Sequence, residues 1–385
     1  MELLKAKEKC CGCAACAHVC PVNAIQMESD DEGFLYPKID HSLCIDCGAC
    51  KATCEFQKET PPSEGALKYA AFRAPTEVRK KSQSGALFYE AARAFLNNGG
   101  VVYGAVLEKN FSVGFARAAS LEQLEPMRGS KYVQAEISQE IYTRIKQDLN
   151  NGLNVMFCGT TCQAAQIYNM FGQKYPDQLI VLDIVCHGVP SPLLWKEYLN
   201  YQSGRLHHPI TSADFRDKRF GWHSHIEHIK AGKKSYTGDI WTQLFYSHLA
   251  LRPSCFHCWY RGLKHYSDIT IADCWGIENE RPDWDDTYGV SLCIVQSNRG
   301  LDFMKDNQLQ TADIEIQNCL QTPLKKCYPV PSERAVFWKL YREKGFAAIA
   351  RQYGGDTIRG RLRTRLKCVA KRGKAMIERK RQAKC

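Results

Sequence analysis

Two matching runs of cysteine near the start of the chain limit its possible folds more than any other feature. Both runs have the spacing C-x2-C-x2-C-x3-C, and their members are Cys10, Cys13, Cys16, Cys20, Cys44, Cys47, Cys50 and Cys54. This spacing is typical of bacterial ferredoxins, in which the fourth cysteine of each run binds the other cluster. We therefore expect one [4Fe–4S] cluster on Cys10, Cys13, Cys16 and Cys54, and a second on Cys44, Cys47, Cys50 and Cys20.

Zinc and disulfides are the alternatives for these cysteines. The chain has 20 cysteines, which in a secreted protein would indicate disulfides. Met1 to Lys9 contain charges but no apolar segment of the kind that signal peptides have. Zinc sites usually draw four ligands from two pairs rather than from a repeated triple-plus-one run. We therefore expect iron–sulfur clusters in a reducing cytoplasm, with Cys11 as a bystander between two ligands.

The chain has 385 residues, which is long enough for one larger body in addition to this small module. Pro61 to Gly65 predicts a linker. Strands are predicted at 67–72, 101–107, 154–158, 179–185, 269–272 and 290–295, and helices at 84–96, 140–149, 163–171 and from Ser191. This alternation favours an α/β domain with a mixed sheet. We expect an α+β ferredoxin-like module at 1–60, the α/β domain at 66–345 and a basic helix or tail at 346–385.

Four cysteines of the body indicate a further metal centre. Cys255 and Cys258 form a C-x2-C pair, which alone is compatible with zinc, a redox dithiol or half of a cluster site. Cys162 follows one predicted strand and Cys186 follows the next. Because the carboxyl ends of parallel strands meet at one edge, the four thiols could converge there. The alternative is that each is a small buried apolar side chain.

Six stretches of the body carry a resemblance to a known family. They are Ser82–Leu87, Gly129–Gln134, Gly159–Gln163, Cys186–Ser191, Cys255–Cys258 and Asp268–Gly276. Together they resemble the coenzyme F420 hydrogenase/dehydrogenase β-subunit family, in the form with a fused N-terminal two-cluster ferredoxin. The family usually has a second glycine where this chain has Ala86.

The resemblance implies FAD in the body beside a third [4Fe–4S] cluster. It implies the cluster ligands Cys162, Cys186, Cys255 and Cys258, with Cys274 as a rival fourth ligand. It implies FAD contacts from Ser84, Gly85, Ser130, Lys131, Gly159, Thr160, Thr161, Gln163 and His187. Backbone amides at the two turns would bind phosphate. Lys131 would offer a positive charge to the pyrophosphate or the flavin N1–C2=O edge, and His187 would lie near the ring.

These expectations favour an oxidoreductase. FAD would exchange a hydride with an organic carrier, for which the family name suggests coenzyme F420, and the clusters would carry single electrons. No side chain is assigned a catalytic role. The alternative is a non-catalytic electron-transfer subunit that supplies a partner enzyme. Either function requires a redox partner protein or a small-molecule hydride carrier.

The net charge of +11 comes almost wholly from the C-terminus. The last 30 residues contain 12 Lys/Arg and two acids, with apolar residues such as Ile358 and Leu362 interspersed. This pattern is compatible with a helix on an anionic membrane or an acidic partner, and equally with a solvated extension. The tail lacks aromatic residues for stacking, so we expect no nucleic acid. We expect a cytoplasmic protein, with the inner membrane face as its peripheral location if the tail binds lipid.

Three histidines close in sequence, His223, His225 and His228, invite a metal interpretation. His223 and His225 are alternate residues and could share one face of a strand, but no third ligand with zinc-like spacing accompanies this pair. An exposed hairpin is the commoner explanation, and we expect that here.

Overall fold

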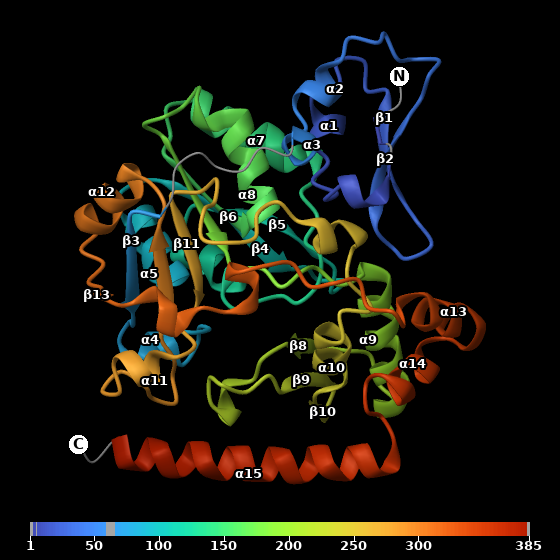
Figure 1. Ribbon diagram of the computed structural model, residues 1–385, viewed down its shortest axis with the longest axis vertical. Coiled ribbons are helices and arrows are strands. Elements are labelled where there is room, and N and C mark those ends of the chain that lie inside the picture. The colour runs from blue at the N-terminus through green and yellow to red at the C-terminus, as the bar shows by residue number, and fades with distance from the viewer. Residues whose placement is uncertain (1–2, 5, 59–65, 383–385) are drawn as a thin grey trace.

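The cysteine-rich N-terminus forms its own unit at one end of the molecule (Figure 1). The structure, a computed structural model, describes residues 3–4, 6–58 and 66–382, so the predicted linker at 61–65 lies outside the described residues. The unit contains an antiparallel hairpin and short helices: η1 (Lys7–Lys9), α1 (Ala15–His18), β1 (Ile25–Ser29), β2 (Leu35–Ile39), α2 (Ala49–Ala52) and α3 (Glu55–Lys58). Helices α1 and α2 each begin after a left-handed residue, Ala14 (φ 63°) and Gly48 (φ 76°). The repeat in sequence is thus also a repeat in structure.

An eight-stranded mixed sheet forms the centre of the larger α/β domain. Its strands, in spatial order, are β13 (Ala312–Asp313), β3 (Lys68–Phe72), β12 (Ser291–Val295), β11 (Ile269–Asp273), β7 (Leu179–Ile184), β6 (Val155–Thr160), β4 (Val101–Leu107) and β5 (Val113–Ala118). Strands β11, β7, β6 and β4 run parallel to one another, and the flanking pairs are antiparallel. The carboxyl ends of four strands therefore meet at one edge, where ligands commonly bind in such sheets.

Alternate residues of the central strands face two separate cores, as the period of two requires. Val155 and Phe157 of β6 lie in one core, whereas Met156 and Cys158 lie in the other. Helices α7 (Gln139–Asn150), α8 (Thr161–Ile167), α9 (Pro192–Leu206) and α10 (Ile240–Tyr246) contribute to the first core, as do two C-terminal helices described below. The helices of the second are α5 (Leu87–Asn97), α6 (Leu121–Leu124) and α12 (Asn298–Asp306).

A small sheet and the C-terminal helices complete the body. The sheet has the order β10 (Lys234–Gly238), β9 (Glu227–Ala231), β8 (Ser212–Asp214). The helices are α13 (Arg334–Lys344), α14 (Phe346–Gln352) and α15 (Ile358–Gln382), and short elements are α4 (Thr76–Arg79), η2 (Glu125–Met127), η4 (Lys218–Phe220), η5 (Pro253–His257), α11 (Ile277–Glu280), η6 (Ile316–Cys319) and η7 (Thr322–Leu324). Phe346 and Ile349 of α14 are buried in the first core, whereas α15 lies along the outside of the molecule (Figure 1).

The predicted strands and most of the predicted helices are present within a few residues of their expected bounds. The helix predicted at 163–171 begins earlier, at Thr161, because Thr160 and Gln163 form a reciprocal capping box. It continues into a π-helical turn, η3 (Tyr168–Gly172). Within the described residues, no helix is both long and apolar enough to cross a membrane.

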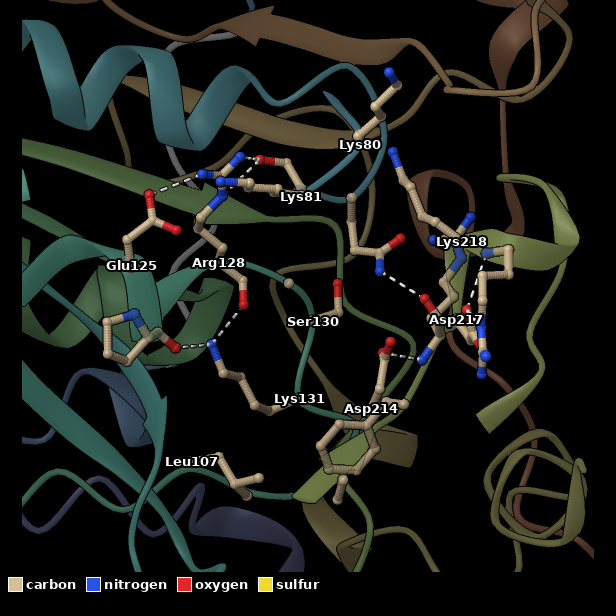
Figure 2. Close-up of a pocket in the computed structure, with 18 of the residues that line it drawn as sticks. Lys80, Lys81, Leu107, Glu125, Arg128, Ser130, Lys131, Asp214, Asp217 and Lys218 are labelled. Atoms are coloured by element: carbon tan, nitrogen blue, oxygen red, sulfur yellow. Dashed lines mark hydrogen bonds and ion pairs between the residues drawn. The ribbon is translucent and has the colours of Figure 1, made fainter. Parts of the chain in front are cut away.

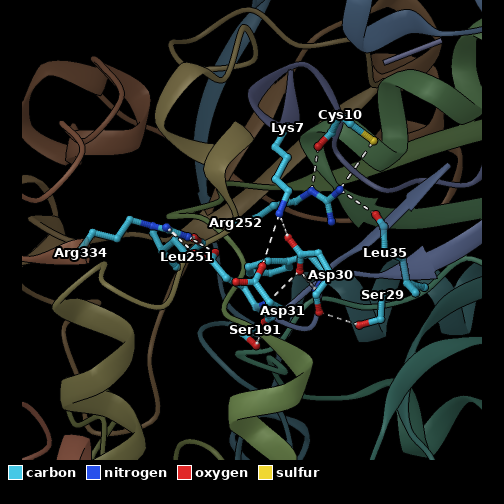
Figure 3. Close-up of polar contacts among 12 residues, drawn as sticks. Lys7, Cys10, Ser29, Asp30, Asp31, Leu35, Ser191, Leu251, Arg252 and Arg334 are labelled. Carbon is cyan, nitrogen blue, oxygen red and sulfur yellow. Dashed lines mark hydrogen bonds and ion pairs between the residues drawn. The ribbon is translucent and has the colours of Figure 1, made fainter. Parts of the chain in front are cut away.

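Arg252 joins the N-terminal unit to the body (Figure 3). Its side chain is fully buried, and its guanidinium donates to the carbonyl oxygens of Cys10 (2.8 Å) and Leu35 (2.8 Å) and to the side chain of Gln134 (3.1 Å). Gly12 is required beneath it, because a Cβ there would lie 2.7 Å from Arg252 Nη1 and the backbone has φ +74°. The charge is therefore held by backbone carbonyls of the N-terminal unit and by a side chain of the body.

Further contacts surround this arginine. Arg334 forms a two-pronged ion pair with Glu32, and Ser191 donates to the Glu32 carbonyl oxygen (Figure 3). On the opposite side, Gln166 of α8 accepts from the Glu55 amide (3.1 Å) and donates to the Thr53 carbonyl oxygen (2.8 Å). The unit is thus fixed to the body on two sides.

Replacing Arg252 with methionine is expected to lower the free energy of unfolding by about 3 kcal/mol, because three buried acceptors lose a charged donor. Chemical unfolding of the anaerobically purified chain, followed by circular dichroism, measures the change. Arg342→Met is the matched control, because Arg342 faces Asp31 at the same boundary (3.3 Å) but is half exposed; its expected effect is under about 1 kcal/mol. Equal unfolding midpoints for the two variants would contradict the role of Arg252.

Candidate functional site

The eight cysteines of the N-terminal runs surround two cavities. One is lined by Cys10, Cys13, Cys16 and Cys54, and the other by Cys20, Cys44, Cys47 and Cys50. These are the two crossed sets that the spacing predicts. No three His, Cys, Asp or Glu side chains in the described part of the chain are close enough to hold one metal ion; each set of four encloses a cavity instead.

The two cavities differ in their exposure. Burial raises the pKa of the thiols of Cys10 and Cys16, and raises that of Cys54 to about 11. In the second set Cys47 is exposed, and Leu43 and Ile45 beside it are 53% and 61% exposed. The first set is therefore the inner one, close to the body, and the second reaches the surface of the molecule.

A third set of cysteines lies where β6 and β7 end. Cys162 is in the first turn of α8, Cys186 follows β7, and Cys255 and Cys258 lie in and just after η5. Their thiols are electrostatic neighbours of one another. Backbone amides of Gly188 and Val189 donate to the sulfurs of Cys186 (3.3 Å) and Cys255 (3.4 Å). The structure thus brings together the four ligands that the resemblance implied.

Arg261 provides positive charge for this third set. Its guanidinium donates to the Cys186 carbonyl oxygen and lowers the pKa of Cys186 and Cys258, against the larger opposing effect of burial. Cys274, the rival ligand, lies elsewhere: it is fully buried in an apolar cluster, and its sulfur contacts Cys319 at 3.6 Å. The small-hydrophobe role therefore applies to Cys274.

Cys11 lies between the first and the third sets. Its side chain packs with Cys13 and Cys162 in one small cluster, and the proximity of these two sulfurs together with burial raises its own pKa. The proximity of Cys11 in turn lowers the pKa of Cys13, and lowers that of Cys162 to about 7. Phe56 and Tyr260 complete an apolar cluster around the three cysteines. Sequence spacing alone gave Cys11 no role, whereas the fold makes it the contact between two cysteine sets.

A cavity of about 450 Å³ opens beside the third set, at the carboxyl ends of the parallel strands. Cys186 forms part of its wall. Of the residues implied for FAD, Ser84, Ser130, Lys131, Gly159, Thr160, Gln163 and His187 line it. Its size is typical of ligand pockets, which span about 300–1,000 Å³.

Two of the implied residues, Gly85 and Thr161, do not line this cavity. The Gly85 amide donates to the Ser291 hydroxyl (2.9 Å), so it is not available to a phosphate. A Cβ at Gly85 would lie 2.0 Å from the Phe72 carbonyl oxygen, which explains the glycine by close packing. Thr161 is buried at the start of α8.

One end of the cavity wall contains an ion pair between Asp273 and Arg216, to which Ser84 adds a hydrogen bond. Asp273, at the end of β11, is bonded by Arg216 (2.7 Å) and by the Ser84 hydroxyl. Burial opposes the charge of Asp273, but Arg216 and Ser84 keep the pKa of Asp273 below its usual range. Ser84 itself has a left-handed backbone (φ 48°), so this contact is made by a conformation that serine seldom adopts. Asp273 therefore stays ionised in the wall.

The histidines of the cavity are neutral at physiological pH. Burial, together with Arg261, lowers the pKa of His187 to about 4, and its Nδ1 is 3.0 Å from the Tyr328 hydroxyl. Burial also lowers the pKa of His225 to about 3. His225 lines the cavity, on the loop before β9, so the expectation of an exposed hairpin is wrong for this residue.

A second, basic cavity of about 600 Å³ adjoins the first (Figure 2). The two share Ser82, Gln83, Arg128, Gly129, Ser130 and Lys131. Lys131 donates to the carbonyl oxygens of Pro126 (2.9 Å) and Arg128 (3.2 Å), and burial lowers the pKa of Lys131 to about 7. Burial and the nearby Arg216 lower the pKa of Lys218 to about 7 as well.

The basic cavity was not foreseen from the sequence. Its cations come from separate segments: Lys80, Lys81, Arg128, Lys131, Arg216, Lys218, Arg219 and, from α15, Arg379. Three acids, Glu125, Asp214 and Asp217, also line it. The excess of positive charge suits an anionic group.

Comparison with known proteins gives two family matches. Residues 152–319 match the family described as the C terminus of the beta subunit of coenzyme F420 hydrogenase/dehydrogenase, and residues 9–58 match the 4Fe-4S dicluster domain. The protein named "Ferredoxin 7Fe" from Hydrogenibacillus schlegelii is 47% identical over 49 residues, which are 12% of this chain and 56% of that protein. The chain thus spans little more than half of that relative.

A chain in the structure of the F420-reducing [NiFe] hydrogenase complex from Methanosarcina barkeri aligns with a TM-score of 0.44 and 15% identity, over 75% of this chain and 91% of that chain. The two family matches cover the two parts that the fold separates, the N-terminal unit and the cysteine-bearing half of the body. Residues 152–319 are thus similar to the C-terminal part of the coenzyme F420 hydrogenase/dehydrogenase beta subunit, and residues 9–58 are similar to a 4Fe-4S dicluster domain.

Proposed function

We propose that this chain is an iron–sulfur flavoprotein oxidoreductase that moves electrons between an organic hydride carrier and a redox partner protein. One observation supports it above the rest: Cys186 belongs both to the third cysteine set and to the wall of the 450 Å³ cavity. A cluster on that set would therefore adjoin whatever the cavity binds. The two adjoining cavities together offer space for FAD, and coenzyme F420 is the carrier that the family description suggests.

We assign the cluster ligands as three sets: Cys10, Cys13, Cys16, Cys54; Cys20, Cys44, Cys47, Cys50; and Cys162, Cys186, Cys255, Cys258. Iron binding requires thiolates, and burial favours the neutral thiol at most of these positions. Arg252 beside Cys10 and Arg261 beside the third set offset that cost with positive charge. Bound clusters would carry single electrons, and bound FAD would convert a hydride into two of them.

The residues around the two cavities favour FAD with its phosphates toward the basic one. Ser130 and Lys131 stand where the cavities meet, with Arg128 beside them. Thr160 and Gln163 are fixed by their capping box, so the wall of the first cavity is rigid at that point. Neutral His187 and ionised Asp273 would present fixed polar groups to a ring bound between them.

The exposed end of the N-terminal unit supports docking of a protein partner. The second cysteine set lies there, flanked by exposed Leu43 and Ile45. From this end the three sets follow one another inward, with Cys11 between the first and the third. We propose residues 1–60 as the cluster-binding domain and 66–345 as the flavin-binding domain, with α14 continuing the core of the latter and a cytoplasmic location for both.

The competing function is a non-catalytic electron-transfer subunit. For that function the N-terminal unit with its two cysteine sets would be sufficient, because the second set reaches the surface. A chain with about eight iron atoms and no flavin after anaerobic purification would favour that function over ours.

The iron content tests the third set directly. Native protein purified without oxygen is expected to contain about 12 iron atoms per chain, and Cys258→Ser about eight. Cys274→Ser is the matched control, because this buried cysteine contacts Cys319 and not the third set; it should keep about 12. Full iron content in Cys258→Ser, or loss of four iron atoms in Cys274→Ser, would contradict the assignment.

A bulky residue at the junction of the cavities tests the flavin site. Ser130→Trp is expected to abolish copurification of FAD while leaving about 12 iron atoms in place, because an indole there fills the shared space. Ser235→Trp, on the exposed face of β10, is the control and should retain FAD. Flavin analysis after acid release measures both. Retention of one FAD by Ser130→Trp would rule out this placement.

The lowered pKa values of Lys131 and Lys218, each about 7, predict a pH dependence of FAD binding to flavin-depleted protein. Both lysines are charged below pH 7 and lose their charge above it. The affinity should therefore be level at acid pH and fall above about pH 7, by up to about tenfold per pH unit for each lysine required. Lys131→Arg should flatten part of this slope, because arginine stays charged. Titration by flavin fluorescence measures it, and an affinity that rises above pH 7 would contradict the model.

A further inference from the structure

Helix α15 turns a polar face toward the body and an apolar face toward solvent, the opposite of a helix that packs on a protein core. Its inner face is polar: Thr364 and Lys367 bond the two carboxylate oxygens of Asp239 (3.0 and 2.7 Å), and Arg379 donates to the Lys218 carbonyl oxygen (2.6 Å). Ala375 is the one residue of the helix, among those whose side chains are described, that is almost fully buried. The helix is therefore attached to the body by polar bonds, without a hydrophobic seam.

The apolar residues of α15 point away from the body. They are Ile358, Leu362, Leu366, Val369, Met376 and Ile377, and between 51% and 85% of each is exposed. At about 3.6 residues per turn these positions share one face, opposite the face that carries Thr364, Lys371 and Ala375. From Ile358 to Ile377 the stripe is therefore about 29 Å long, at about 1.5 Å per residue. An exposed apolar surface of this kind marks an interaction site.

Positive charge borders the stripe on both sides. Exposed Arg361, Arg365 and Arg372 lie along one border, and exposed Arg363 and Lys374 along the other. The helix contains a single acid, Glu378, which is partly covered and lies 3.7 Å from Lys374. Flanking arginines and lysines can extend to lipid phosphates while aliphatic side chains enter the acyl boundary.

We propose that the outer face of α15 binds an anionic lipid bilayer, with the helix lying in the plane of the membrane surface. Figure 1 shows α15 as a straight outermost element, at the opposite end of the long axis from the N-terminal unit. A flat surface can therefore contact the whole stripe. A second copy of the chain is a poorer occupant, because two such borders of like charge would repel. A protein groove would usually be met by aromatic anchors, and the described part of the stripe is aliphatic.

This inference is independent of the proposed redox function, because it involves no cofactor. The test is cosedimentation of the full chain with vesicles of phosphatidylcholine and phosphatidylglycerol in equal parts, against vesicles of phosphatidylcholine alone. We expect binding to the mixed vesicles, weaker binding to the neutral ones, and a loss of affinity with added salt.

Variants of the stripe make the test specific. The triple variant L362Q/L366Q/V369Q should bind the mixed vesicles at least about tenfold more weakly. V330Q/V336Q is the matched control, because these valines are 53% and 56% exposed but lie outside α15; it should bind like the native chain. Circular dichroism and iron content should be the same for all three proteins.

Three outcomes would overturn the proposal. The first is a native chain that binds neither kind of vesicle. The second is a triple variant that binds as tightly as the native chain. The third is a native chain that forms a dimer without lipid and a triple variant that is monomeric, which would assign the stripe to a second copy.

Discussion

The buried guanidinium of Arg252 is the contact on which the arrangement of the molecule depends. It donates to the carbonyl oxygen of Cys10 in the first cysteine run and to that of Leu35 in the hairpin. It also donates to the side chain of Gln134 in the body. A buried cation needs several acceptors to be stable. Two of the acceptors of Arg252, the carbonyl oxygens of Cys10 and Leu35, lie more than 200 residues before it in the sequence. The third, the side chain of Gln134, belongs to the body. Together with Gln166 and the Arg334–Glu32 ion pair, it holds the N-terminal unit against α8, where the first and third cysteine sets meet.

Local spacing explains what could be predicted from the sequence. The ligands of each N-terminal cavity lie within short runs, and the crossing of Cys20 and Cys54 follows from the repeat. The central strands were predictable because they are short continuous apolar runs, such as Val155–Cys158 and Leu179–Leu182, and the helices because turn residues and caps bound them. The third set needed the resemblance, because Cys162, Cys186 and the pair in η5 are joined only through the sheet.

Long-range contacts explain what the sequence did not reveal. Gly85 looked like part of a phosphate loop, yet its amide is satisfied by Ser291, more than 200 residues later. The cations of the basic cavity come from segments far apart in the chain, and only the fold brings Lys80, Lys131 and Lys218 to one cavity. Arg252 has no motif at all. Cys11 was expected to be a bystander because its partners, Cys13 and Cys162, lie on opposite sides of a domain boundary.

The position of Cys11 also bears on how the protein is assembled. The Cys11 thiol lies close to Cys13 and Cys162, one proposed ligand from each neighbouring set. In metal-free protein, two-electron oxidation would join Cys11 to one of them as a disulfide and remove that sulfur from iron binding. Apoprotein with such a disulfide must therefore be reduced before that cysteine can bind iron. A Cys11→Ala chain could not form this disulfide.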